Sequence, residues 1–211
     1  MGFAVDLHTH TRHGSSCSYM EPRDLVRRAE EVGLDAVCIT EHNTSWEKDA
    51  LKALGDGATL RLFGGVEVST ECGDVLVFGL EGEVPRAGIE ELRRAVDRSG
   101  GVMIAAHPFR RYSVAGVSLD VDEASRSPVL RWVDAAEVFN GLSTRREVEL
   151  AQEVLSRLGL RGVGGSDSHA PHTVGACYTV FERSLATVRD LVDEIKAGRF
   201  QAAHRGFDLT F

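Results

Sequence analysis

The stretch Phe3-Ala4-Val5-Asp6-Leu7-His8-Thr9-His10 decides the fold class of this chain. It begins as a short apolar run that is typical of a buried strand, and it ends in two histidines. A doubly wound nucleotide-binding sheet has a glycine-rich phosphate loop at this point, and no such loop follows here. Because residues two apart on an extended chain point to the same side, His8 and His10 can chelate one ion.

Outward from this stretch, short apolar runs alternate with amphipathic segments of helix length. We expect strands at residues 3–7, 34–40, 60–68, 102–106, 133–139, 160–164 and 176–181, with extended pieces at 74–80 and 200–203. We expect helices at residues 22–31, 46–54, 89–98, 145–158 and 187–196. Strands separated by helices predict a mostly parallel α/β sheet. Without a phosphate loop, the pattern favours a TIM-like barrel over an open doubly wound sheet, with residues 110–131 as one long barrel loop.

The composition is that of a globular protein, and we expect residues 1–211 to form a single domain. The 211 residues are 43% hydrophobic and 27% charged, which excludes a disordered chain. The longest apolar runs are strand-sized, far below the ~20 residues of a membrane-spanning helix. No secretory segment is evident, so we expect a cytoplasmic protein. The net charge of −8 argues against an extended nucleic-acid face or binding to an anionic membrane.

The expected strands run into histidines or carboxylates. These residues are His8, His10, His42, Glu67, His107, Glu137, Asp167 and His169. The carboxyl ends of the strands in a parallel barrel open on one face, so we expect these side chains to converge. Imidazole and carboxylate ligands suit zinc, manganese or iron. Their number exceeds what one tetrahedral zinc takes, which argues for at least two metal ions.

Five motifs carry a resemblance to a known family. They are Asp6-Leu7-His8-Thr9-His10-Thr11, Ile39-Thr40-Glu41-His42-Asn43, Gly65-Val66-Glu67-Val68-Ser69, Ala106-His107-Pro108 and Gly165-Ser166-Asp167-Ser168-His169. In this order they resemble the PHP (polymerase and histidinol phosphatase) superfamily. The resemblance implies a distorted (βα)7 barrel, two or three divalent metal ions and hydrolysis of phosphoesters. Residue by residue, it implies one ion held by His8, His10, Glu67 and Asp167, a second by Glu67 and His107, and a third by His42 and His169.

The sequence departs from the family pattern in two places. Many relatives have a ligand of the third metal shortly after the His-x-His pair, where this chain offers only His13 or Cys17. The alternative is that these are an ordinary loop histidine and a half-buried cysteine. Relatives of the histidinol phosphatase type also use a histidine near the fifth strand, where Glu137 and Asn140 are the candidate replacements. A two-metal site is therefore an open alternative.

Such a site needs no protein nucleophile, because metal ions lower the pKa of bound water and the resulting hydroxide attacks phosphorus. Arginine supplies a forked donor to the remaining phosphate oxygens. Arg110 and Arg145 lie in loops after expected strands, so we predict that they bind the substrate phosphate. We expect the substrate to be a small phosphomonoester, a nucleotide or an oligonucleotide end.

Two other functions are open on the sequence alone. An amidohydrolase-like carbon–nitrogen hydrolase also opens with His-x-His, but many such enzymes bridge their metals with a carboxylated lysine. The lysines of this chain, Lys48, Lys52 and Lys196, all lie in expected helices, and Glu67 takes the place of such a bridge. A metal-binding domain whose catalysis has decayed is the other alternative, and the near-complete set of ligands argues against it.

Overall fold

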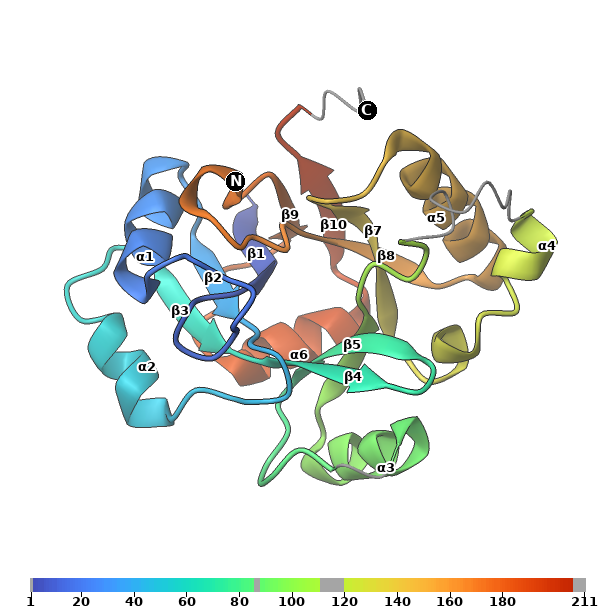
Figure 1. The fold of residues 1–211 in the computed structure, drawn as a ribbon, viewed down its shortest axis with the longest axis horizontal. Coiled ribbons are helices and arrows are strands. Elements are labelled where there is room, and N and C mark those ends of the chain that lie inside the picture. The colour runs from blue at the N-terminus through green and yellow to red at the C-terminus, as the bar shows by residue number, and fades with distance from the viewer. Residues whose placement is uncertain (1, 86–87, 111–119, 207–211) are drawn as a thin grey trace.

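A computed structural model of the chain describes residues 2–85, 88–110 and 120–206, which form two five-stranded sheets. The strand order in the first sheet is β10 (Phe200–His204), β9 (Cys177–Phe181), β1 (Phe3–Thr9), β2 (Ala36–Ile39) and β3 (Arg61–Gly64). The order in the second sheet is β4 (Val66–Thr70), β5 (Gly73–Phe78), β6 (Val102–Ala105), β7 (Ala135–Asn140) and β8 (Arg161–Gly165). Most helices lie around the outside of these strands, whereas α6 (Val188–Ala197) lies in the middle of this view, between the two sheets (Figure 1).

Fewer of the strand pairs are parallel than the sequence predicted. In the first sheet β2 is parallel to both β1 and β3, and in the second sheet β7 is parallel to both β6 and β8. In contrast, β9 is antiparallel to β1 and β10, and β5 is antiparallel to β4 and β6. The prediction of a mostly parallel sheet is therefore wrong, and the fold is a mixed α/β arrangement of two sheets.

No closed barrel is found among the strands of the described residues. The two sheets meet through two isolated parallel bridges, Thr9 with Ser168 and His42 with Glu67. One core cluster nevertheless combines side chains from both sheets, such as Leu7 of β1 and Ile104 of β6. The sheets therefore face a common apolar interior, and the bridges join them just beyond the carboxyl ends of β2 and β8.

The single strand expected at residues 60–68 is two strands that belong to different sheets. The break falls at Gly65, between β3 and β4. A Cβ atom at Gly65 would lie 2.4 Å from a ring carbon of Phe78 and 3.1 Å from a side-chain carbon of Thr40. Glycine therefore lets the chain pass from one sheet to the other through a gap too narrow for a side chain. As a result, Glu67 lies near the start of β4 and not at the end of a strand.

The helix bounds follow start and stop signals in the sequence. Helix α1 (Pro22–Glu31) begins at a proline, and α5 (Arg145–Leu158) begins at a capping box on Thr144 and ends before a left-handed Gly159. The remaining expected helices are α2 (Lys48–Leu54), α3 (Ile89–Ser99) and α6 (Val188–Ala197).

The expected long loop at residues 110–131 is only partly irregular. Its described part contains α4 (Val121–Ala124) and the 3-10 helix η1 (Pro128–Arg131), and residues 111–119 lie outside the described residues. A second short 3-10 helix, η2 (Pro171–Thr173), follows β8. The prediction of one continuous barrel loop is therefore wrong for the part that the structure describes.

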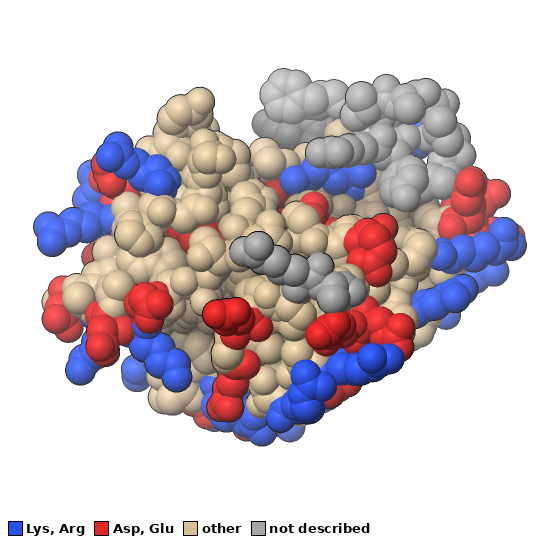
Figure 2. All heavy atoms as spheres, turned by 60° about the horizontal axis from the view of Figure 1, so that its bottom comes forward, with Lys and Arg blue, Asp and Glu red and all other residues tan. Residues whose placement is uncertain are grey.

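Apolar side chains fill the interior of the protein, and most charged side chains lie on its surface. Leu191, Val192 and Ile195 of α6 join the core cluster that both sheets line. On the face shown in Figure 2, basic and acidic side chains are interspersed. None of the described helices has the length and apolar character needed to cross a bilayer.

Candidate metal centre

The candidate ligands gather where the two sheets meet. They come from β1 and the residue after it (His8, His10), from the segment after β2 (His42), from β4 (Glu67), and from the segments after β6 (His107) and β8 (Asp167, His169). Backbone hydrogen bonds place these segments side by side. The Asp167 N–H donates to the His8 carbonyl at 2.8 Å, and the Glu67 N–H donates to the Glu41 carbonyl at 3.0 Å.

Two of these residues have a backbone conformation that residues with side chains rarely adopt. The φ angle is 31° at His107 and 53° at Asp167. Such conformations persist only where the surrounding structure fixes them, and they cluster at functional sites. Close packing is also required at Gly165, where a Cβ atom would lie 2.6 Å from both Glu137 Oε1 and His8 Cβ. Glycine therefore allows β8 to lie against β1 at this point.

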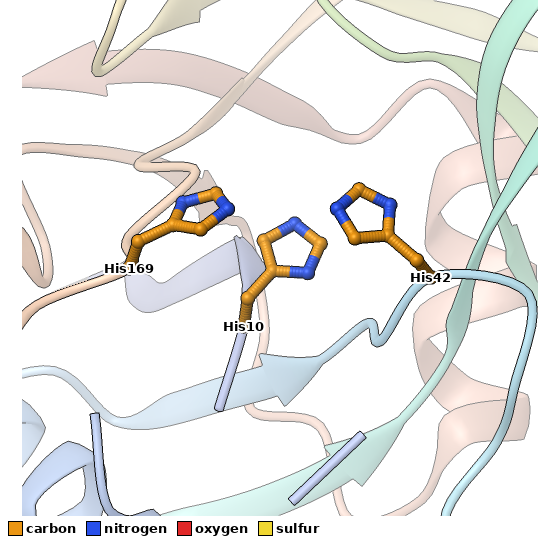
Figure 3. Close-up of side chains that lie close together, drawn as sticks. All are labelled: His10, His42 and His169. Carbon is orange, nitrogen blue, oxygen red and sulfur yellow. The ribbon is translucent and has the colours of Figure 1, made fainter. Parts of the chain in front are cut away.

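Side-chain atoms of these residues form three groups, each able to hold an ion. The groups are His8, His10 and Asp167; His8, Glu67 and His107; and His10, His42 and His169. Within each group the ligand atoms lie within 4.8 Å of one another. In the third group, the rings of His42 and His169 flank His10, and ring nitrogens turn toward the space between them (Figure 3). The structure thus brings together all seven residues that the family resemblance implied.

The contacts within the site fit divalent cations. Glu67 Oε2 is buried, and it has no hydrogen-bond partner in the described part of the chain. The nitrogens around it are His42 Nδ1 at 2.9 Å, His10 Nε2 at 3.2 Å and His8 Nε2 at 3.4 Å. The Nε2 atoms of His8 and His10 also face each other at 2.9 Å. A buried oxygen surrounded by imidazole nitrogens is a donor set for zinc, manganese or iron.

The charges within the site also favour divalent cations. Burial opposes a charge on His8, but the surrounding carboxylates, led by Asp167, outweigh it and raise the pKa of His8 well above its ordinary value. Burial also opposes ionisation of Glu67 and Asp167, yet nearby histidines hold the pKa of each carboxyl well below its usual range. The same carboxylates that favour a positive charge on His8 also favour a bound cation, and metal binding displaces protons from its ligands.

Glu137 and Asn140 lie behind the candidate ligands, and neither belongs to the three groups. Glu137 Oε1 accepts from His8 Nδ1 at 2.9 Å. Its Oε2 accepts from the His107 N–H and from Asn140 Nδ2, each at 2.7 Å. With Nδ1 of His8 engaged in this way, Nε2 is the nitrogen that remains for an ion. The geometry gives Glu137 the contacts of a residue that orients His8.

Arg110 lies within the site. Its Nη2 donates to Asn140 Oδ1 at 2.5 Å and also to Asp167 Oδ2. Both hydrogen bonds use Nη2, and 25% of the side chain is exposed, so part of the guanidinium remains accessible from the cavity that Arg110 lines. Arg145, the other candidate for the phosphate, is exposed in the first turn of α5.

The two candidate ligands of the first loop have different surroundings. His13 stacks against Trp46, with ring centroids 4.3 Å apart, and it belongs to none of the three groups. Cys17 Sγ lies 3.2 Å from His169 Nε2. Cys17 is exposed, so the alternative of a half-buried cysteine is wrong. Partial burial of the thiol, together with nearby carboxylates such as Asp167, raises the pKa of Cys17. Of the two residues, Cys17 lies beside the candidate ligand His169, whereas His13 packs against the ring of Trp46.

A cavity of about 500 Å³ opens onto the site. Its walls include the candidate ligands His42, Glu67, His107, Asp167 and His169, together with Arg110 and Cys17. Its lining also includes Gly73, Asp74 and Ser127, and Arg145 is not among its lining residues. The volume lies in the range of pockets that bind small organic ligands.

Two buried polar residues of the site were not singled out from the sequence. Asp6 accepts the backbone N–H groups of His8, Ser166 and Gly175, and burial raises its pKa to about 6. A signal for Asp6 existed, because a carboxylate inside an apolar strand needs buried partners. Ser15 contacts His10 Nδ1 at 3.1 Å, and nothing distinguishes it from other loop serines in the sequence.

Matches to family models agree with this geometry. A model described as the PHP domain matches residues 6–142, and a second, described as PHP-associated, matches residues 145–200. The first match covers more than half of the chain and contains the candidate ligands from His8 to His107. The chain belongs to the PHP domain family.

Individual proteins are similar to this chain in sequence or in fold. An uncharacterized protein of Methanocaldococcus jannaschii, MJ1587, is 28% identical over 115 residues, which cover 50% of this chain and 67% of that protein. A solved two-domain protein from Bacteroides vulgatus, described as containing a predicted PHP-like metal-dependent phosphoesterase, is 20% identical with a TM-score of 0.72, over 97% of this chain and 65% of that one. A solved amidohydrolase from Chromobacterium violaceum, described with bound sulfate and no metal, is 16% identical with a TM-score of 0.65, over 93% and 96% of the two chains.

Proposed function

We propose that this protein is a metal-dependent hydrolase of phosphoester bonds. The observation that carries the proposal is the set of three overlapping ligand groups at the wall of one cavity, with Arg110 beside them. His8, His10, His42, Glu67, His107, Asp167 and His169 would hold two or three divalent ions, zinc, manganese or iron. Ions held there would supply Lewis-acid activation of water and neutralisation of phosphate oxygens.

The residues around the ligands have supporting roles in this proposal. Glu137 orients His8 through Nδ1, and its contact with the His107 backbone holds the strained turn after β6. Arg110 donates to a phosphate oxygen through the guanidinium donors that Asp167 and Asn140 leave available. No side-chain nucleophile is required, because water can attack phosphorus directly.

The cavity supports a small substrate, such as a phosphomonoester, a nucleotide or the end of an oligonucleotide. Its volume of about 500 Å³ accommodates a phosphate and a group of nucleoside size. The mixed charge of the face in Figure 2 offers no extended basic stripe for a long nucleic acid on that side.

The test is phosphate release by purified protein that has been stripped of metal and reloaded separately with zinc, manganese or iron. The panel contains phosphomonoesters, nucleotides and short oligonucleotides, with His10→Ala as the inactive control. We expect turnover that requires metal and that the His10→Ala variant loses while it remains folded.

Acyl p-nitroanilides in the same panel address the amidohydrolase alternative. Hydrolysis of these amides without any release of phosphate would assign the site to carbon–nitrogen bonds. If the reloaded protein binds metal but turns over neither class of substrate, the decayed metal-binding domain is the better account.

A further inference from the structure

Glu41 is a buried carboxylate next to the candidate metal centre, and its partners are all uncharged. The side chain is fully buried, and in the described part of the chain no lysine, arginine or histidine pairs with it. Its Oε1 accepts from the backbone N–H and the hydroxyl of Thr11 and, at 3.1 Å, from Trp46 Nε1. Its Oε2 accepts from the Ser15 hydroxyl at 2.5 Å and from the Thr11 N–H at 3.1 Å, so the two oxygens share this N–H. Since every neighbour donates, Glu41 acts only as an acceptor.

Ser15 connects this carboxylate to a candidate ligand. The serine hydroxyl has one proton, which it gives to Glu41, and two lone pairs. One lone pair accepts the His42 backbone N–H at 3.2 Å. The other faces His10 Nδ1 at 3.1 Å. Because the serine proton is already engaged, the contact with His10 can form only if His10 Nδ1 carries the proton and donates it.

A proton on Nδ1 also determines the state of the other ring nitrogen of His10. With the proton on Nδ1, Nε2 has the lone pair, and this atom lies 3.2 Å from Glu67 Oε2 and 3.3 Å from Asp167 Oδ1. Histidine ligands of metals commonly have their second nitrogen held by a carboxylate or another acceptor, which fixes the tautomer and the ring orientation. His8 has a direct contact of this kind with Glu137.

We propose that Glu41, acting through Ser15, is a positioning residue that sets the tautomer of His10 and so presents Nε2 to the metal centre. The inference rests on the metal centre of the proposed function. Gly14 supports the arrangement, because a Cβ atom there would lie 2.7 Å from Glu41 Cγ. The loop before Ser15 thus packs directly on the glutamate.

Substitution Glu41→Gln tests the direction of the hydrogen bonds that run from His10 through Ser15 to residue 41. It keeps the shape of the side chain. The Thr11 hydroxyl and Trp46 Nε1 donate to Oε1 alone and require the amide oxygen at that position, so the amide NH₂ must face Ser15. Ser15 would then accept from the glutamine and give its own proton to His10 Nδ1. We expect the proton of metal-free His10 to move from Nδ1 to Nε2.

The measurement is the ¹⁵N spectrum of the imidazole rings, with the His10 signals assigned by their loss in His10→Gln. Cobalt(II) affinity, followed by absorbance, is the second readout, and we expect it to fall about 10–100-fold in Glu41→Gln. Trp46→Phe is the matched control, since it removes one donor to Glu41 and leaves the Ser15 link intact. It should keep the native tautomer and the native cobalt affinity.

Ser15→Ala covers the case in which Glu41→Gln fails to fold, because it keeps Glu41 with its remaining donors. We expect a similar loss of cobalt affinity. The proposal is overturned if His10 keeps a protonated Nδ1 and full cobalt affinity in these variants, or if Trp46→Phe weakens cobalt binding equally. These readouts do not involve phosphate release, so an inactive wild-type protein would contradict the proposed function and leave this result standing.

Discussion

Asp167 is the residue on which most contacts of the site converge. Its Oδ1 lies 3.4 Å from His8 Nε2 and 3.3 Å from His10 Nε2, and its Oδ2 accepts from Arg110. The carboxylate thus belongs to a candidate ligand group and also holds the arginine that we expect to bind phosphate. Its left-handed backbone turns the chain at this point, which ties the position to the fold as well as to the chemistry.

Substitution Asp167→Asn keeps the size of this side chain and removes its charge. We expect phosphate release to fall by more than about 100-fold, beyond the loss typical for a residue that only orients a ligand. Metal content, measured on the same preparation, should fall with it. Asp193→Asn, on the exposed face of α6, is the control and should retain full activity and metal content. Full activity in Asp167→Asn would remove this residue from the site.

His8 and His10 illustrate what can and cannot be predicted from the sequence about single residues. The spacing of His8 and His10 at the end of an apolar run was enough to predict that both side chains face one site. The residues that orient them are distant in the chain: Glu137 for His8, and Glu41 through Ser15 for His10. Such pairings depend on which hydrogen bonds are already used, and only coordinates reveal that.

At the scale of single elements, β1 is tied to its neighbours through a buried carboxylate. Asp6 Oδ1 accepts the Ser166 N–H at 2.8 Å and the His8 N–H at 3.3 Å, and its Oδ2 accepts the Gly175 N–H at 2.9 Å. These contacts fix the segments before and after η2 against the strand that carries the two histidines.

Substitution Asp6→Ala should therefore destabilise the protein. It leaves three buried N–H groups without an acceptor, and each such group costs about 1–3 kcal/mol. Asp6→Asn keeps one acceptor oxygen and should cost less. Urea unfolding of the two variants and the wild type measures the difference. If Asp6→Ala unfolds at the same urea concentration as the wild type, the carboxylate does not hold these segments.

Helix α6 offers a pH-dependent contribution that is remote from the metal centre. Glu194 is buried, and hydrogen bonds from Arg199 and Arg183 lower its pKa from an ordinary 4.5 to about 2. Because the folded pKa lies below the unfolded one, its ionised form stabilises the fold above about pH 4.5, and this contribution disappears as the pH falls toward 2.

Stability measured from pH 7 to pH 2 in the wild type and in Glu194→Gln tests this contribution. We expect the variant to be less stable at pH 7 and the gap between the two proteins to close in the acid range. Glu182→Gln, at an exposed position near the same arginines, serves as the control and should follow the wild type. A gap that is constant with pH would mean that Glu194 contributes through packing alone.

The bounds of most elements could be predicted because their signals are local. Proline at the start of α1 and the threonine before α5 mark helix starts in the sequence itself. The direction of β5 and the division of residues 60–68 could not be predicted. The division depends on Gly65 meeting Phe78 at the end of β5 and Thr40 just after β2, and a glycine inside an apolar run gives no indication of what surrounds it. The direction of β5 depends on its antiparallel pairing with β4 and β6.

In the whole molecule, the candidate metal centre lies where the two sheets meet. Ligand groups combine His8 from the first sheet with Glu67 from the second, next to the two bridges between them. Buried carboxylates at this junction raise the pKa of His8, and the surrounding histidines hold the pKa of Glu67 well below its usual range. Ions that bind the folded junction and not the unfolded chain should therefore stabilise the entire fold.

Thermal unfolding of stripped and metal-loaded protein measures this coupling. At a free metal concentration of about 100 times the dissociation constant, one site adds about 2.7 kcal/mol to the stability. We expect a higher unfolding temperature on loading and a smaller rise in Asp167→Asn. If the unfolding temperature does not respond to any of the three metals, ions do not bind at the junction of the sheets.

We propose that the residues at this junction form one centre with several ions. Anomalous scattering from crystals loaded with zinc, manganese or iron, in the presence of phosphate, locates the ions without reference to activity. We expect at least two anomalous peaks within the groups formed by His8, His10, His42, Glu67, His107, Asp167 and His169, with phosphate between the ions and Arg110. Crystals that contain metal with no peak at these residues would contradict it.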